Sequence, residues 1–231
     1  MSRVPGVVAG VVKSLADPKN MGRIQVSFDW MDDAPQSYWA RVAAPMAGGE
    51  RGCFFMPEAN DEVLVAFDHG DVAHPYVVGY CWSGTDQPPY SANPKKRGVI
   101  TPIKHELTFD DDAKKITLKT PGGFALTLDE TGKQATLTTQ SGVKLQLDDA
   151  ASSVTVALPS GNQVVLGPSG LSVSVAAGTL DVTAASATIT ASALTINAGA
   201  TTFSGAVTVA GPLTAAAIVS PSYTPGAGNL L

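Results

Sequence analysis

Four side chains of types that bind metal ions lie within one short stretch: Asp68, His69, Asp71 and His74. Imidazole nitrogens and carboxylate oxygens are the usual ligands of zinc and related metals. The spacing of these four residues matches no strong ligand motif, and the stretch lies between two predicted strands. We therefore interpret it as a solvated turn and predict no metal site.

Acidic residues also cluster, at Asp110 to Asp112, at Asp129-Glu130 and at Asp148-Asp149. A calcium loop of the EF-hand type would need a glycine and a glutamate at fixed later positions, and the first cluster has neither. It is better interpreted as a polar hairpin turn before Lys114. The other two clusters occupy equivalent positions in a repeated pattern, which favours a structural role in successive turns.

The sequence contains no combination of residues that predicts catalysis. It has no nucleophile with an evident base, no carboxylate pair with contrasting environments, and no phosphate-binding Gly-Lys-Ser/Thr loop. We therefore expect a protein that is not an enzyme and binds no cofactor. Cys53 and Cys81 are too few for a disulfide framework and are expected to be buried thiols in a reducing compartment.

Charge and composition limit the partners. The net charge is −5, and only 15% of the residues are charged. Nucleic-acid binding depends on clustered Lys and Arg, and the one basic cluster, Lys95-Lys96-Arg97, follows a proline-rich stretch typical of a solvated linker. No nucleic-acid partner is expected. There is no recognisable signal peptide and no apolar run of membrane-spanning length, so we expect synthesis in the cytoplasm.

The elements that hold these residues differ between the two halves of the chain. The first half alternates apolar and polar residues in five short runs, with a turn at Asp17 to Gly22 and a Gly-rich loop at Ala47 to Gly52. Such a pattern predicts a small β-barrel. The expected strands are Val7 to Lys13, Arg23 to Trp30, Tyr38 to Ala43, Val63 to Phe67 and Tyr76 to Tyr80.

The second half is a repeat. Apolar pairs return every nine or ten residues at first, and every seven residues later, as at Val173, Leu180, Ala187 and Leu194. From Ala150 to the C-terminus the chain carries one charge, Asp181. Thr, Val, Ser and Gly occupy the positions where a coiled coil would need Leu, Glu and Lys.

A β-solenoid built from a single chain explains the repeat better than a coiled coil does. However, one strand of seven to ten residues per repeat is too short for a complete coil, which usually needs about 20 residues or more. Three chains, each supplying one side, would close such a prism. Closure would also remove the exposed strand edges.

Two blocks of the sequence resemble a known family. The run from Ala66 to Gly79, AFDHGDVAHPYVVG, followed by Pro88-Pro89-Tyr90, is similar to the barrel domain of phage baseplate assembly protein V and of VgrG spikes of type VI secretion. The stretches Lys104 to Asp111 and Lys115 to Gly123 resemble the entry into the β-helix of the same proteins. The blocks occur in the expected order and at the expected spacing.

The resemblance implies an all-β fold, with an N-terminal OB-type barrel and a C-terminal triple-stranded, intertwined β-helix formed by a homotrimer. The expected domains are a barrel at 1–85, a linker at 86–102, a β-helical shaft at 103–218 and a tip segment at 219–231. The implied function is the central spike of a contractile injection apparatus, driven through the target envelope by sheath contraction. A phage tail, a tailocin, an extracellular injection system and a secretion system are all compatible with it.

The implied partners are a baseplate hub or tube-adaptor protein at the barrel, a PAAR-type protein at the tip, and the target cell envelope. The three histidines, His69, His74 and His105, all lie far from the C-terminus, so a metal-binding tip is not expected. The tip segment breaks the repeat and either covers the end of the shaft, contacts the tip protein or frays. Its candidate contact residues are Val219, Pro221, Tyr223, Pro225, Leu230 and Leu231.

Two other functions fit parts of the sequence. The barrel alone is compatible with an oligonucleotide- or oligosaccharide-binding module, in which exposed aromatic rings stack on bases within a basic groove. Against this, eleven acidic residues offset six basic ones before Tyr90. A β-helical fibre acting on surface polysaccharide would need carboxylates on the shaft, and the distal shaft has only Asp181. The aromatic side chains in question are Trp30, Tyr38, Trp39, Tyr80 and Trp82.

Overall fold

The computed structural model describes residues 3–30, 37–91, 93–217 and 219. The chain divides into two compact units, Met1–Leu180 and Asp181–Leu231. The described residues form strands and no helix, which confirms the all-β prediction. Within them there is accordingly no helix long and apolar enough to cross a membrane.

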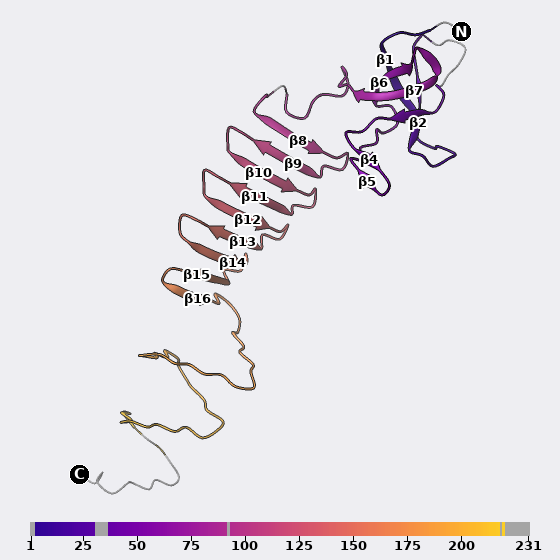
Figure 1. Ribbon diagram of the computed structural model, residues 1–231. Coiled ribbons are helices and arrows are strands. Elements are labelled where there is room, and N and C mark those ends of the chain that lie inside the picture. The colour runs from indigo at the N-terminus through magenta and orange to yellow at the C-terminus, as the bar shows by residue number, and fades with distance from the viewer. Residues whose placement is uncertain (1–2, 31–36, 92, 218, 220–231) are drawn as a thin grey trace, which may run out of the picture. The chain divides into compact units, whose positions relative to one another are not determined.

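The first strands close into a barrel in the order β1-β2-β3-β7-β6 (Figure 1). Neighbours are antiparallel, apart from the parallel pair of β3 and β7. This confirms the barrel predicted from five short strands. Its strands are β1 (Val7–Ser14), β2 (Arg23–Ser27), β3 (Ala40–Val42), β6 (Glu62–Asp68) and β7 (Asp71–Tyr80).

The barrel core follows from the alternation along these strands. Every second residue points inward, and Val12, Ile24, Val26, Val63 and Val65 are fully buried. Gly10 is required by this packing, because a Cβ atom there would lie 2.4 Å from Cγ1 of Val26. β-Branched side chains, together with the rings of Phe28 and Phe67, therefore fill the interior.

Two parts of the barrel half differ from the expected elements. The predicted Gly-rich loop contains a short hairpin, β4 (Ala47–Gly48) and β5 (Arg51–Gly52). The turn expected from Asp68 to His74 is shorter in the structure, because β6 ends at Asp68 and β7 begins at Asp71. Asp71 pairs directly with Asp68 across this turn.

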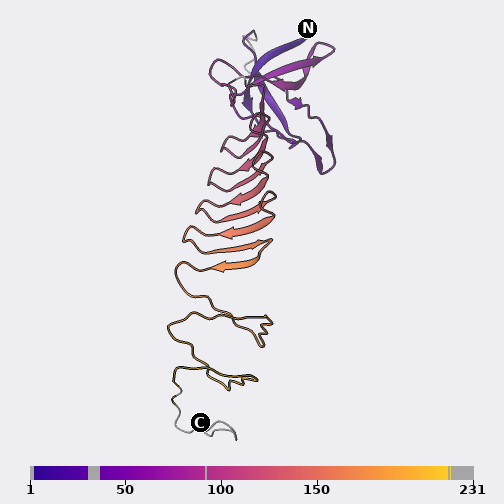
Figure 2. The same cartoon turned by 90° about the vertical axis from the view of Figure 1, so that its left-hand side faces the viewer.

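The second half begins with one antiparallel sheet of nine strands in sequence order (Figure 2). Each strand is hydrogen-bonded to the next along the chain. The strands are β8 (Lys96–Ile100), β9 (Glu106–Asp110), β10 (Lys115–Lys119), β11 (Ala125–Asp129), β12 (Gln134–Thr138), β13 (Lys144–Asp148), β14 (Ser153–Ala157), β15 (Gln163–Gly167) and β16 (Gly170–Ser174).

Two turn types alternate along this sheet, so the repeating unit is a pair of strands with one turn of each type. At one edge Thr120 and Thr139 accept a hydrogen bond from the backbone of the residue four positions on. In these turns Gly123 and Gly142 adopt positive φ angles of 90° and 85°. At the other edge a strand-end aspartate accepts a hydrogen bond from the backbone N–H three residues on, as Asp129 does from Gly132.

The stretch predicted as a linker, 86–102, contains a strand. Its second half forms β8, which pairs with β9 from Lys96 opposite Asp110 to Ile100 opposite Glu106. The proline-rich residues obscured this strand in the sequence because they immediately precede it. The basic cluster thus opens the sheet.

Regular strands end at Ser174. Residues 175–217 form no strand, although the repeat pattern predicted strands up to residue 218, and Figure 2 shows the chain there without arrows. Strands of five residues joined by turns of four or five need nine or ten residues each. A spacing of seven residues leaves room only for a two-residue turn, as between β15 and β16. Residues 175–217 form no such hairpin, so they make no strand pairs among themselves.

Candidate assembly surface

The two faces of the nine-stranded sheet have opposite character. Side chains alternate across a strand, and the register places the large apolar residues of β9 to β16 on one face, except for Val165. The other face carries mainly Thr, Lys, Asp and Gln. The apolar face consists of Leu107, Phe109, Ile116, Leu118, Leu126, Leu128, Ala135, Leu137, Leu145, Leu147, Val154, Val156, Val164, Leu166, Leu171 and Val173.

The apolar face is uncovered in the single chain. Leu128, Leu147 and Leu166 are 46%, 51% and 56% exposed, whereas Thr117, Thr127 and Thr136 on the polar face are half-buried. Soluble monomers rarely expose a contiguous apolar surface of several strands. This face is therefore built to be covered.

The polar face is held together by a ladder of cross-strand pairs near the aspartate turns. Lys96 Nζ lies 3.1 Å from Asp110 Oδ2, and Lys115 Nζ lies 2.8 Å from Asp129 Oδ2. At the third equivalent position, Gln134 takes the place of lysine and donates to Asp148 Oδ2 at 2.7 Å. The ladder thus loses its cation at the third pair.

These aspartates stabilise the turns and the strand pairs beside them. The Ala113 N–H and then Lys96 lower the pKa of Asp110, and Lys115 and then the Gly132 N–H lower the pKa of Asp129. The turn containing Asp110 to Asp112 is therefore a capped hairpin, as predicted. Arg97 also pairs with Asp111.

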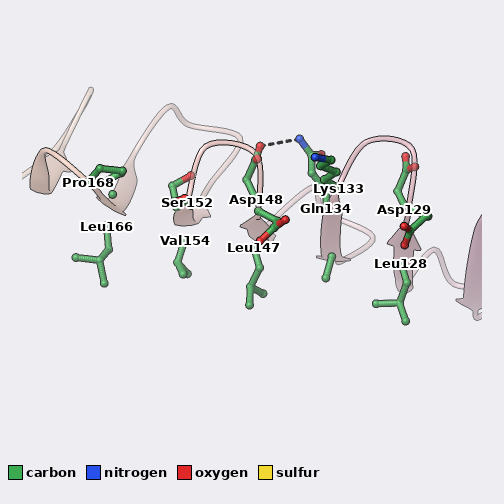
Figure 3. A pocket seen from close by; sticks show the side chains of 15 residues that line it. Leu128, Asp129, Lys133, Gln134, Leu147, Asp148, Ser152, Val154, Leu166 and Pro168 are labelled. Carbon is green, nitrogen blue, oxygen red and sulfur yellow. Dashed lines mark hydrogen bonds between the residues drawn. The ribbon is translucent and has the colours of Figure 1, made fainter.

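A hollow of about 870 Å³ lies along the edge of the sheet that carries the aspartate turns. Figure 3 shows Leu128, Leu147, Val154 and Leu166 pointing to one side of the sheet and Asp148, joined to Gln134, on the other. Ala135 lies between Leu128 and Leu147 in the register and has the smallest side chain of the row. The hollow therefore combines an apolar floor with a polar rim.

The barrel residues considered for chemistry form no metal site. His74 Nδ1 lies 3.1 Å from Asp71 Oδ2, and the Ala73 N–H and then His74 lower the pKa of Asp71. His69 contacts Asp68 only at 3.8 Å. Among the described residues no group of three or more His, Cys, Asp or Glu side chains is placed to hold a metal ion.

The aromatic and cysteine residues of the barrel half have several different surroundings, and Tyr80, Cys81 and Trp82 line a hollow of about 310 Å³. Trp30 stacks on Phe28 at 5.5 Å, and the guanidinium groups of Arg23 and Arg41 lie over the rings of Trp39 and Tyr76. The prediction of buried thiols was wrong, since Cys53 is exposed and Cys81 is only half-buried. Cys53 directly follows the β4–β5 hairpin. It lies in no strand, so there is no alternation of buried and exposed residues from which its exposure could be predicted.

Of the six candidate tip residues, Val219 is described and is 98% exposed. The other five, Pro221, Tyr223, Pro225, Leu230 and Leu231, lie outside the described residues.

The sequence alone did not reveal the partners of the turn aspartates, Lys96 and Lys115. The equal spacing from Lys96 to Lys115 and from Asp110 to Asp129 was the available signal.

Comparison with known proteins agrees with this architecture. Residues 8–82, which span the barrel, match the family model of the type VI secretion system/phage-baseplate injector OB domain. The barrel is an OB domain of the kind found in VgrG and baseplate V-type proteins. It is 32% identical over 105 residues to the type VI secretion system spike protein VgrG3 of Vibrio cholerae, and 31% identical over 109 residues to VgrG2a of Pseudomonas aeruginosa.

These VgrG alignments cover 41% and 42% of this chain but only 10% and 13% of the relatives. The actin cross-linking toxin VgrG1 of Vibrio cholerae is 31% identical over 105 residues, again 10% of its length. The chain thus spans about a tenth of the length of the curated relatives it matches. The comparisons assign the barrel and support a baseplate or spike role.

Proposed function

We propose that this VgrG-type chain is the structural central spike of a contractile injection apparatus, formed by three copies whose sheets pack with their apolar faces inward. The barrel at 1–85 would join a hub or tube-adaptor protein, and the shaft would extend through 103–218. The segment 219–231 would meet a tip protein of the PAAR type. The assembled spike would be driven through the target envelope by sheath contraction and would need no enzymatic activity.

The uncovered apolar face carries this proposal. Burying one Leu, Ile, Val or Phe side chain contributes about 1.5–3 kcal/mol, so covering a row of such residues on eight successive strands strongly favours association. A closed prism of three sheets would bury every member of this face. It would give a stiff rod that resists fraying, as a penetrating shaft requires.

The scarcity of charge beyond the sheet supports the same function. Residues 175–217 include the single charge Asp181 and have no strand partners within one chain. If three chains wind together there, each backbone gains partners from the other two. The short repeat would then give the thinnest part of the shaft.

Two neighbouring residues on β12 provide a matched test. Leu137 lies on the apolar face and Thr136 on the polar face. We expect Leu137→Asp to abolish the trimer, because it places charges in the dry core, and Thr136→Asp to leave it intact. Light scattering on the purified full chains measures the mass of each, and equal behaviour of the two variants would contradict the proposal.

A further inference from the structure

The two turn edges of the sheet differ in shape and charge. We define the glycine edge by the turns 120–124 and 139–143, and the aspartate edge by the turns 130–133 and 149–152. At the glycine edge Phe124 and Val143 stand one residue before β11 and β13, where they continue the alternation that places Leu126 and Leu145 on the apolar face. The aspartate edge presents the hollow floored by Leu128, Ala135 and Leu147.

The two edges also differ in their ion pairs. The ion pairs among the described residues of this sheet all lie on the aspartate edge. Lys119 and Lys144 lie at the glycine edge and form none of these ion pairs. On the aspartate edge Glu130 and Asp149 likewise form none of them.

Symmetry determines which residues of the two edges meet. This step rests on the proposed three-copy spike, with its axis along the direction in which the strands are stacked. Rotation about that axis brings one edge of each sheet to the opposite edge of the next and leaves every residue at its own height. The first residues of a strand therefore face the last residues of the same strand in the next copy.

We propose that the glycine edge of one copy docks into the hollow on the aspartate edge of the next copy. Phe124, which immediately precedes β11, packs on Leu128 near the end of β11 of the next copy. Val143 packs in the same way on Leu147, at the two ends of β13. The small side chain of Ala135 leaves room between these two contacts.

The polar face supplies a second contact at the same height. Asp148 has no lysine partner of the kind that Asp110 and Asp129 have, since Gln134 occupies that position. Lys144 begins the strand that Asp148 ends, on the same face, and is the last Lys or Arg of the sequence. Lys144 of one copy therefore provides the missing cation for Asp148 of the next.

Cysteine cross-linking tests this arrangement. In the full chain with Cys53 and Cys81 replaced by serine, we expect Phe124→Cys combined with Leu128→Cys to give covalent trimers on oxidation, seen on a denaturing gel. Within one chain these positions are about 13 Å apart along a strand, too far for a disulfide, whose Cα atoms lie within about 7 Å. Any cross-link must therefore join two copies.

Three controls separate this contact from other packings. Phe124→Cys alone and Leu128→Cys alone should not cross-link, because each edge meets the opposite one. Phe124→Cys with Leu166→Cys joins the same two edges but at heights four strands apart, and should also fail. Val143→Cys with Leu147→Cys should succeed like the first pair.

The outcomes distinguish this inference from the proposed function. A trimeric mass with no cross-linking in either matched pair, or with cross-linking of a single-cysteine variant, would overturn the edge contact and leave the three-copy spike standing. A monomeric mass before oxidation would overturn both. Covalent trimers from the two matched pairs, with all three controls negative, would establish the contact.

Discussion

Among single residues, Asp17 organises the turn between β1 and β2. Its carboxylate accepts hydrogen bonds from the backbone N–H groups of Lys19 and Met21, at 3.0 and 2.8 Å. It also accepts two from the Arg23 guanidinium, at 3.0 and 2.6 Å. These partners, Arg23 first, hold the pKa of Asp17 far below its usual range.

Replacing Asp17 by Asn should lower the thermal midpoint of unfolding at pH 7, because the charge-assisted bonds to Arg23 are lost. Below about pH 3.9, the ordinary pKa of Asp, the unfolded wild-type chain takes up a proton that the folded chain resists. The stability that Asp17 contributes is therefore lost as the pH falls below this value toward the lowered pKa of the folded state. The difference in thermal midpoint between the wild type and the Asn variant should shrink in the same range.

Thermal unfolding between pH 3 and pH 7, followed by circular dichroism, measures this effect. Asp29→Asn is the control, since Asp29 is exposed and forms none of the described hydrogen bonds or ion pairs. If the thermal midpoint of the Asp17 variant lay below that of the wild type by the same amount across this pH range, the charge of the Asp17 carboxylate would not stabilise the fold.

The roles of single residues could be predicted where a residue acts through its neighbours in sequence. The acidic clusters were expected to be turns, and Asp110, Asp129 and Asp148 each cap the turn that follows them. Their cross-strand partners could not be predicted in the same way. Those contacts depend on which strands pair and in which register.

Among the elements, the alternating turns of the sheet determine its regularity. Gly123 adopts a φ angle of 90°, a region that side chains with a Cβ atom rarely occupy. Gly122, in the same turn, has an ordinary φ angle, and nothing lies within 4 Å of the position of an added Cβ atom. The two adjacent glycines thus differ in what they require.

Gly123→Ala should destabilise the sheet by about 1 kcal/mol or more, whereas Gly122→Ala should change stability by no more than about 0.5 kcal/mol. Denaturant unfolding of the two full-length variants at one protein concentration measures the difference. Equal effects would mean that the positive φ angle of Gly123 is not required by the fold.

The strands could be predicted because their period of two survives in the sequence wherever one face is apolar. The barrel strands and β9 to β15 are of this kind. β8 was missed because its first residues are Lys96 and Arg97, and the β4–β5 hairpin because it is two residues on each side. Residues 175–217 keep the apolar period without forming strands, since periodicity reports which side chains are to be buried and not where the backbone finds its partners.

Over the whole molecule, charge and apolar surface are divided along the chain. The excess of acidic residues lies before Tyr90, in the barrel, and after it the Lys and Arg residues equal the Asp and Glu residues in number. The sheet has one apolar and one charged face, and from Ala150 onward the chain carries the single charge Asp181. The apolar face and the weakly charged segment after it are the surfaces that the proposed three-copy spike would cover.

The spike proposed above requires that two further copies of the chain cover the apolar face of the sheet. Light scattering coupled to size-exclusion chromatography on the full-length protein measures the number of copies. One chain has a mass of 23.6 kDa, so we expect a single species of three times that mass that persists on dilution. A stable species with the mass of one chain, its apolar face open to water, would contradict the proposal.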